Sequence, residues 1–315
     1  MTDPVTAQSI AEAQARIATY LTPTPLERAP KLGAVWLKLE NVNPTHSFKV
    51  RGALNAMLRL KESGAATPEV IAASSGNHAQ ALAYAARLTG VKATILMPSH
   101  TPRKKVDGVR LHGGEGVLFG TNYDAAEAEA IRRSKEEEIP YISPYNDADI
   151  VSGAGTCGQE LLAQLPEMAR VLVPASGGGL LTGIAVAIKS ARPDCEVIGV
   201  CAAHAPAMHN VKHGTALPQV WDTLAEALSG DIEVGAITVG LAHKYVDRVV
   251  LVTEEQIAEA MRWMLSEQGW LIEGGGAVTV AALRSGTVAD DGRPTVCVVS
   301  GSNLDLETVK RIVAD

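Results

Sequence analysis

Short apolar runs of strand length alternate along the chain with longer segments whose apolar residues recur at helical spacing. The strand candidates are residues 34–40, 70–75, 92–98, 115–120, 170–176, 196–202, 248–253 and 295–301. The clearest helical segments between them are residues 78–90, 123–138 and 253–269. Strands that alternate with helices predict parallel sheets joined by crossover helices, which is an α/β fold.

Local signals mark the ends of two of these helices. The segment 78–90 ends on Gly90, a residue type that readily takes the left-handed conformation found after a helix C-terminus. The segment 253–269 starts with Thr253 and carries Gln256 three residues later, which is the capping-box pattern. We therefore expect both segments to be helices with these boundaries.

The composition excludes several classes of function. The 315 residues are 46% hydrophobic and 20% charged, which is typical of a globular protein large enough for two lobes. The formal net charge of −7 argues against nucleic acid as the main partner, because phosphate binding favours a basic face. The chain shows no signal-peptide pattern and no apolar run of membrane-spanning length. Its four cysteines lack metal-binding or disulfide-like spacing, so we expect reduced thiols and a cytoplasmic location.

Glycine-marked turns follow three of the predicted strands. ASSGNHAQ (73–80) leads directly into a helix, whose free N–H groups favour an anion such as a carboxylate. VPASGGGLLTG (173–183) places three glycines before a helix that opens at Leu180. It matches neither the dinucleotide nor the P-loop pattern and fits a single phosphate monoester better. VVSGSN (298–303) ends a strand on a serine. Turns that bind no ligand remain an alternative for each pattern.

A lysine stands at the start of another predicted helix. Lys49 lies between Phe48 and Val50, where a polar turn gives way to an apolar helix. Burying an unpaired ammonium is costly and forces the amine towards its neutral form. A phosphate site, a carboxylate site and a neutral amine together suggest pyridoxal 5′-phosphate, an aldehyde cofactor that joins lysine as a Schiff base. The alternative is a lysine whose ammonium reaches water past an apolar stem.

The order of these motifs resembles the fold-type II pyridoxal-phosphate enzymes, specifically the threonine/serine dehydratase and serine racemase branch. The resemblance rests on PTHSFKVRGA, SSGNHAQALA, SGGGLLTG and SGSN, and it extends over residues 22–306. It implies a two-lobed architecture like that of the tryptophan synthase β-subunit, in which each lobe is a mostly parallel sheet flanked by helices. Residues 1–65 and 146–315 would form the large cofactor-binding lobe, and residues 66–145 a small inserted lobe.

The resemblance also implies roles for individual residues. Lys49 would hold the cofactor and move the Cα proton, Asn77 would hydrogen-bond the cofactor's 3′-oxygen, and Ser75 stands where racemases keep a second acid/base. Ser300 would meet the pyridine nitrogen. Because a hydroxyl cannot keep the ring protonated, elimination of a β-leaving group suits this site better than transamination. The other residues implied to bind the cofactor are Phe48, Ser176, Gly177, Gly178, Gly179, Leu180 and Glu273. Those implied to bind the substrate are His46, Ser74, Ser75, Gly76, Asn77 and His78.

Three positions depart from the family pattern. His46 replaces the glycine that usually precedes SFK, and its ring would narrow substrate access or, alternatively, transfer protons. Ser176 replaces the first of four glycines, where a hydroxyl should be tolerated. Cys201 stands where metal-activated relatives carry an acidic ligand, so no metal is expected. The alternative is a rebuilt transition-metal site. Its ligands would be Cys201, His204, His209 and His213.

The resulting prediction is a pyridoxal-phosphate-dependent ammonia-lyase that dehydrates and deaminates L-threonine or L-serine to a 2-oxo acid and ammonia. Alternatives within the same fold are serine racemisation and dehydration of hydroxyaspartate or of a hydroxyectoine-breakdown intermediate. Alternatives from other classes are a non-catalytic pyridoxal-phosphate or amino-acid binding protein and a nucleotide-binding protein. The length leaves no room for a C-terminal regulatory domain, so feedback control is not expected. A homodimer is the default assembly, and we expect no nucleic-acid or membrane partner.

Overall fold

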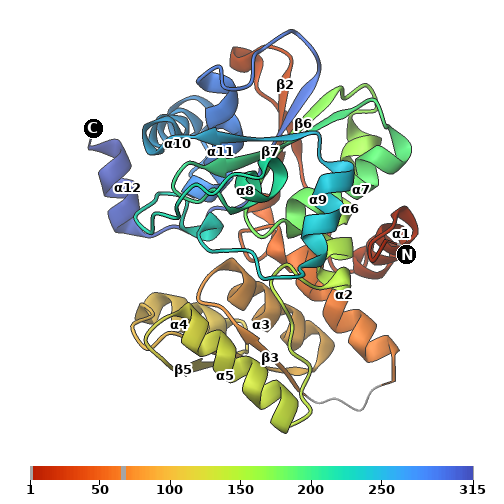
Figure 1. Ribbon diagram of the computed structural model, residues 1–315, viewed down its shortest axis with the longest axis vertical. Helices are drawn as coiled ribbons and strands as arrows, with labels where there is room; N and C mark the ends of the chain where they lie inside the picture. The colour runs from red at the N-terminus through yellow and green to blue at the C-terminus, as the bar shows by residue number, and fades with distance from the viewer. Residues whose placement is uncertain (1–2, 65–68, 315) are drawn as a thin grey trace.

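The computed structural model describes residues 3–64 and 69–314, and its strands form two separate sheets (Figure 1). The larger sheet has the order β1-β2-β9-β6-β7-β8, and the smaller has the order β3-β4-β5. The strands are β1 (Leu26–Arg28), β2 (Val35–Leu39), β3 (Glu69–Ala73), β4 (Lys92–Met97), β5 (Glu115–Leu118), β6 (Arg170–Pro174), β7 (Glu196–Ala202), β8 (Arg248–Val252) and β9 (Thr295–Val299). In Figure 1, the smaller sheet and its helices occupy the lower part of the molecule.

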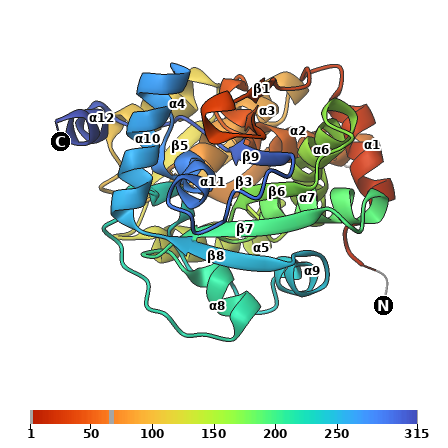
Figure 2. The same cartoon turned by 90° about the horizontal axis from the view of Figure 1, so that it is seen from above.

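Helices connect the parallel strands in both sheets. The α-helices are α1 (Ala7–Ile17), α2 (Lys49–Glu62), α3 (Asn77–Thr89), α4 (Arg103–Leu111), α5 (Tyr123–Glu136), α6 (Ala148–Gln164), α7 (Gly179–Ala191), α8 (Ala207–His213), α9 (Ile237–Tyr245), α10 (Glu254–Gln268), α11 (Gly274–Arg284) and α12 (Leu306–Val313). Short 3-10 helices are η1 (Pro30–Leu32), η2 (Glu40–Val42) and η3 (Glu226–Leu228). Figure 2 shows β7 and β8 side by side, with α10 at one end and α9 at the other.

The predicted α/β fold is confirmed. All eight predicted strands are present, and every strand pair is parallel except β1 with β2. Strand β1 was not predicted, because three residues of sequence LER carry no alternating or apolar pattern. The predicted division into lobes at residues 66 and 145 stays a prediction.

The predicted helix ends are also confirmed. Thr253 and Gln256 form the expected capping box at the start of α10. Gly90 follows α3 with a φ of 75°, the left-handed conformation that glycine adopts without a steric penalty. The helix after the three glycines begins at Gly179, one residue before the predicted start at Leu180.

Small residues bring α2 and α6 into close contact. A Cβ atom on Gly153 of α6 would lie 2.6 Å from the Arg51 carbonyl oxygen, and one on Gly52 of α2 would lie 2.7 Å from the Ile150 oxygen. Neither position accepts a larger residue without moving backbone. The start of α2, where Lys49 lies, is therefore held against α6. None of the helices in the described ranges combines the length and apolar character that a bilayer crossing requires.

Candidate active site

The loop that precedes α2 runs along the end of β9. The Phe48 N–H donates to the Ser300 carbonyl oxygen at 3.0 Å, and the Ser302 N–H donates to the His46 carbonyl oxygen at 2.9 Å. His46 is exposed and has a φ of 56°, a left-handed conformation that favours glycine. These contacts fix the backbone immediately before Lys49, the first residue of α2.

The Lys49 amine lies in a partly buried position. In the part of the chain that the structure describes, its Nζ donates to one oxygen, the carbonyl of Pro144 at 2.8 Å. Nζ also lies 5.2 Å from the centre of the Phe48 ring. Burial lowers the pKa of Lys49 to about 8, although the nearby Glu273 carboxylate acts in the opposite direction. The neutral, nucleophilic amine is therefore more populated near neutral pH than in an exposed lysine.

The turn after β3 leads directly into α3, as predicted. The Ser74 backbone N–H donates to the Leu96 carbonyl at 3.1 Å, and the Gly76 N–H donates to the Ser74 hydroxyl at 3.3 Å. Gly76 is the N-cap residue, and Asn77 is the first residue of the helix. Ser75 and its two neighbours are only half-buried. The first N–H groups of α3 therefore remain accessible to an anion.

Asn77 is tied to the C-terminal part of the chain. Its Nδ2 donates to Glu273 Oε1 at 2.8 Å, and its Oδ1 accepts a hydrogen bond from Asn303 Nδ2 at 2.8 Å. The Asn303 backbone N–H donates to Glu273 Oε2 at 3.0 Å, which closes a ring of hydrogen bonds. Burial raises the pKa of Glu273 to about 7. No role was predicted for Asn303, although it is the last residue of the SGSN motif.

His78 is buried in the first turn of α3. Its Nε2 lies 3.2 Å from the Ile142 carbonyl oxygen, which can only accept, so Nε2 carries the proton. The other ring nitrogen, Nδ1, is buried and has no hydrogen-bond partner among the described residues. Burial and the charge of Lys49 lower the pKa of His78 to about 3. The ring is therefore neutral, with a free acceptor at Nδ1.

The glycine turn after β6 is shaped by Tyr145. A Cβ atom on Gly177 would lie 2.5 Å from Tyr145 Cγ. Gly178 has a φ of 91°, and a Cβ atom there would lie 2.5 Å from Met208 Cε. The Thr238 hydroxyl donates to the Gly177 carbonyl at 2.7 Å. These glycines are therefore needed for packing as well as for an exposed backbone. The contact with Tyr145 was not predicted from the sequence.

The glycine turn also presents the N-terminus of α7. Ser176 is half-buried after β6, Gly179 begins the helix, and Leu180 is buried behind it. The first N–H groups of a helix have no intrahelical acceptor and lie at the positive end of its dipole. This turn is suited to a phosphate group.

Ser300 lies at the end of β9, against the start of α11. It is buried, and its hydroxyl is 3.4 Å from the Gly275 carbonyl oxygen, a long contact that leaves the hydroxyl free to rotate. The hydroxyls of Thr45 and Ser47, in the loop before Lys49, are also buried without partners among the described residues. Buried polar groups without partners are expected where a bound polar ligand supplies the missing hydrogen bonds.

Hydrogen bonds and contacts connect all four segments of the predicted site. The Lys49 amine donates to the Pro144 carbonyl, and the neighbouring Tyr145 packs against the glycine turn. The Phe48 N–H donates to the Ser300 carbonyl. Asn77 joins the turn after β3 to Glu273. An amine with a lowered pKa, a helix N-terminus for phosphate and unpaired buried polar atoms fit pyridoxal phosphate. The residues present therefore suit the cofactor that the sequence predicts.

The alternative metal site is not formed. Its candidate ligands are Cys201, His204, His209 and His213. The rings of His209 and His213 are 4.6 Å apart, but Nδ1 of His209 contacts the Thr215 hydroxyl at 3.2 Å. Cys201 is buried, which raises its pKa to about 12. Within residues 3–64 and 69–314, no group of three or more His, Cys, Asp or Glu side chains is arranged to hold a metal ion.

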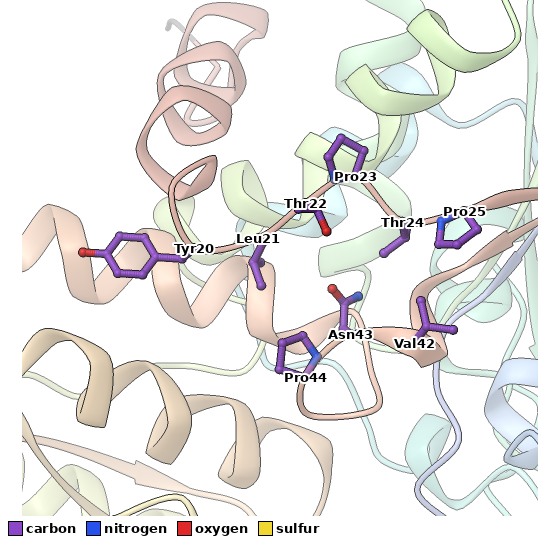
Figure 3. Close-up of a pocket in the computed structure, with 9 residues that line it drawn as sticks. All are labelled: Tyr20, Leu21, Thr22, Pro23, Thr24, Pro25, Val42, Asn43 and Pro44. Carbon is purple, nitrogen blue, oxygen red and sulfur yellow. The ribbon is translucent and has the colours of Figure 1, made fainter.

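A surface cavity of about 170 Å³ lies between residues 20–25 and 42–44 (Figure 3). Thr22 and Asn43 point toward one another across it, and the Tyr20 phenol points away. None of the predicted site residues lines this cavity. It is therefore separate from the site around Lys49.

Comparisons with known proteins agree with this geometry. A family model described as "Pyridoxal-phosphate dependent enzyme" matches residues 17–301. The L-threonine ammonia-lyase of Geobacter sulfurreducens is 42% identical over 286 residues, which cover 90% of this chain and 71% of that protein. The L-threonine ammonia-lyase of Thermotoga maritima is 37% identical over 320 residues, which cover 98% of this chain and 78% of that protein.

Solved structures show the same likeness in three dimensions. The structure of maize serine racemase matches with a TM-score of 0.90 and 30% sequence identity. The match covers 99% of this chain and 97% of that chain. The similarity therefore extends over both sheets and all the site segments.

Proposed function

Because the chain belongs to the pyridoxal-phosphate-dependent enzyme family, we propose that it is an ammonia-lyase acting on L-threonine or L-serine. The predicted family, fold and cofactor are confirmed by the family match and by the relatives. Two relatives named L-threonine ammonia-lyase, at 42% and 37% identity, support the reaction. The products would be a 2-oxo acid and ammonia.

The observation that carries the proposal is the Lys49 amine. It lies at the head of α2 with a pKa lowered to about 8, near the neutral His78 ring and the Glu273 carboxyl. A plain binding protein has no need of a buried amine in its reactive form. A non-catalytic role or nucleotide binding is therefore disfavoured.

Several residues of this chain would hold the cofactor. Lys49 Nζ would bind its aldehyde, and the N-terminus of α7 with Ser176 would bind its phosphate. Asn77 would bind its 3′-oxygen, and Ser300 its pyridine nitrogen. When bound, pyridoxal phosphate supplies an electron-withdrawing ring that acidifies the Cα proton of the attached amino acid.

The chain's own groups would then guide the proton transfers. The neutral Lys49 amine would take the Cα proton as a general base, because its pKa lies close to the operating pH. The turn at Ser74–Asn77 would bind the substrate carboxylate through free helix N–H groups. Ser300 offers only a hydroxyl, which cannot keep a pyridine ring protonated, so elimination is favoured over transamination. The neutral His78 ring adds no positive charge near Lys49.

Serine racemisation is the second candidate. It is supported by the likeness to maize serine racemase and by Ser75, a half-buried hydroxyl in the turn before α3. A racemase needs a second proton donor on the opposite face of the substrate, and Ser75 would supply it. His46 is exposed beside the loop that carries Lys49, where it would influence substrate access.

The test is release of 2-oxo acid and ammonia from L-threonine, L-serine and hydroxyaspartate, with and without EDTA. We expect fast, EDTA-insensitive release from L-threonine or L-serine, and no release by the Lys49→Ala variant. D-serine formation without ammonia would instead indicate a racemase. Turnover of neither L-threonine nor L-serine would contradict the proposal.

We further propose a cytoplasmic homodimer whose two lobes close over the substrate. All four cysteines are buried as free thiols, which suits a reducing compartment. Light scattering of the purified holoenzyme should give twice the mass of the 33.0 kDa chain. A monomer that is fully active would contradict the dimer.

A further inference from the structure

Asn303 is hydrogen-bonded to three separate parts of the site. Its Nδ2 donates to the Thr45 carbonyl and to Asn77 Oδ1, both at 2.8 Å. Its backbone N–H donates to Glu273 Oε2 at 3.0 Å. These partners belong to the loop before Lys49, to the start of α3 and to the start of α11. One residue, through its side chain and its backbone N–H, therefore joins segments that are distant in the sequence.

We propose that Asn303 is a positioning residue that fixes the orientation of the Asn77 amide. With Oδ1 of Asn77 turned to Asn303 and Nδ2 turned to Glu273, the second Nδ2 hydrogen is left to donate to the cofactor. This inference rests on the proposed function for the identity of the acceptor. The orientation itself rests on the hydrogen bonds of the protein alone.

The chemistry of the partners selects one orientation. A flipped Asn77 amide would set its Nδ2 against Asn303 Nδ2 and its Oδ1 against Glu273 Oε1, donor to donor and acceptor to acceptor. Asn303 cannot flip in response, because its Oδ1 would then face the Thr45 carbonyl oxygen, acceptor to acceptor. The ring of bonds is therefore consistent in only one arrangement.

Glu273 could not fix this orientation by itself. Burial raises its pKa to about 7, so near neutral pH a fraction of the molecules carry a protonated carboxyl, which can donate as well as accept. Charged groups on the neighbouring elements also act on Glu273, namely Glu226 of η3 and Lys105 of α4, while Glu273 itself acts on Lys49 of α2. Asn303 donates at every pH. The hydrogen bond from Asn303 to Asn77 Oδ1 therefore does not change with pH.

The test is a double-mutant cycle read out by cofactor affinity. Asn303→Leu keeps the shape of the side chain and removes both donors, and Asn77→Ala removes the group that Asn303 is proposed to orient. We expect Asn303→Leu to weaken equilibrium binding of pyridoxal phosphate about tenfold in the wild-type background. In the Asn77→Ala background it should have no further effect, because Asn303 acts through Asn77.

Asn210→Leu is the matched control. Asn210 lies in α8 and is also half-buried, and its Nδ2 donates to the Leu217 carbonyl at 2.8 Å. Leu217 belongs to the loop after α8, which contains no predicted site residue. It should leave cofactor affinity unchanged in both backgrounds. Equal weakening by Asn303→Leu with and without the Asn77 side chain would overturn the proposal. An unchanged affinity in the wild-type background would also overturn it.

Hydrogen exchange of the cofactor-free protein separates this inference from the proposed function. We expect Asn303→Leu to speed amide exchange about tenfold in the first hydrogen-bonded turn of α3, from Gln80 onward, and Asn210→Leu to leave it unchanged. If the wild-type protein fails to bind pyridoxal phosphate, the proposed function falls, and this exchange experiment still decides whether Asn303 orders Asn77. Unchanged exchange in Asn303→Leu would overturn the positioning role.

Discussion

Lys38 and Lys49 have amines with opposite surroundings. Lys38 is fully buried, and its Nζ donates to Thr24 O at 2.9 Å, to Glu160 Oε2 at 2.5 Å and to Gln164 Oε1 at 2.9 Å. All three ammonium hydrogens have acceptors. The Lys49 amine meets one carbonyl oxygen within the described residues, and burial lowers its pKa.

The Lys38 region is a closed network of paired charges. Arg51, two residues after Lys49, is also buried and donates to Glu40 Oε2 and to Glu160 Oε1, both at 2.6 Å. Two cations therefore face two carboxylates. Although burial opposes it, the charge of Arg51 lowers the pKa of Glu40 to about 2.

The comparison shows how one fold gives buried charges two different uses. Where every donor and acceptor is paired, the charges are fixed and contribute structure. Where pairing is incomplete, burial shifts the pKa and leaves a group available for chemistry. Substitutions at Lys49, Arg51 and His46 test this difference.

Removal of the Lys49 amine should abolish function with little effect on folding. We expect Lys49→Ala to lower turnover by about 10³-fold or more, the range attributed to a lost general base. Without cofactor, its midpoint of thermal unfolding should stay close to the wild-type value, because the amine makes one neutral-acceptor hydrogen bond. Activity assays and calorimetry measure the two effects. A variant that loses stability but keeps turnover would mean that the Lys49 amine is structural and not catalytic.

Disruption of the paired network should have the opposite signature. Arg51→Met leaves Glu40 and Glu160 without their main partner, so we expect a loss of about 3–5 kcal/mol in the free energy of unfolding at pH 7. Urea titration measures it, with Arg59→Met, which loses an exposed ion pair to Asp149, as the control. An equal loss of unfolding free energy in both variants would contradict the claim that a buried ion pair contributes more to stability than an exposed one.

This loss should depend on pH in a definite direction. Because the pKa of Glu40 is lowered from 4.5 to about 2 in the folded protein, its contribution is present above pH 4.5 and is lost as the pH falls through 2. The difference between wild type and Arg51→Met should therefore shrink on acidification. A difference that grows below pH 4.5 would contradict the pairing.

The reactivity of Lys49 should follow its lowered pKa. We expect its rate of reaction with an added aldehyde to rise about tenfold per pH unit up to pH 8 and to level off above it, because the neutral amine reacts. In urea-unfolded protein the rise should continue to about pH 10.4. Reductive labelling with mass spectrometry resolves individual lysines. A plateau at the same pH in both states would show that the fold leaves the amine unperturbed.

His46→Gly should give the smallest effect. His46 has a φ of 56° and an exposed side chain, so glycine relieves backbone strain. We expect a gain of about 0.5–1 kcal/mol in the free energy of unfolding, reduced by the larger entropy of unfolded glycine. Denaturant titration measures it, together with KM for L-threonine. A clear loss of stability would mean that the His46 side chain makes contacts of its own.

The sequence predicted eight strands and the helices between them, because local patterns encode these elements. The site residues stay a prediction that rests on local motifs. The motif around Lys49, the turn before Asn77 and the capping box at Thr253 all depend on residues within a few positions of one another. The sequence also showed that His46 replaces a glycine of the family motif, but not that its backbone is left-handed.

The rest depended on contacts between distant segments. Arg51 and Glu160 are 109 residues apart, and Asn77 and Asn303 are 226 residues apart, so no local pattern could pair them. Lys38 looked like an ordinary charged residue in a short strand, yet it is buried and fully paired. The sequence motif marked Lys49, but it gave no sign that Lys38 is buried, because the partners of Lys38 are distant in the sequence.

The most direct test of this difference is to reduce the protein with borohydride in the presence of pyridoxal phosphate and to map the modified lysine by mass spectrometry. We expect the cofactor to be fixed on Lys49 alone and Lys38 to stay unmodified. Attachment to another lysine, or no covalent attachment at all, would contradict the assignment of Lys49 as the reactive amine.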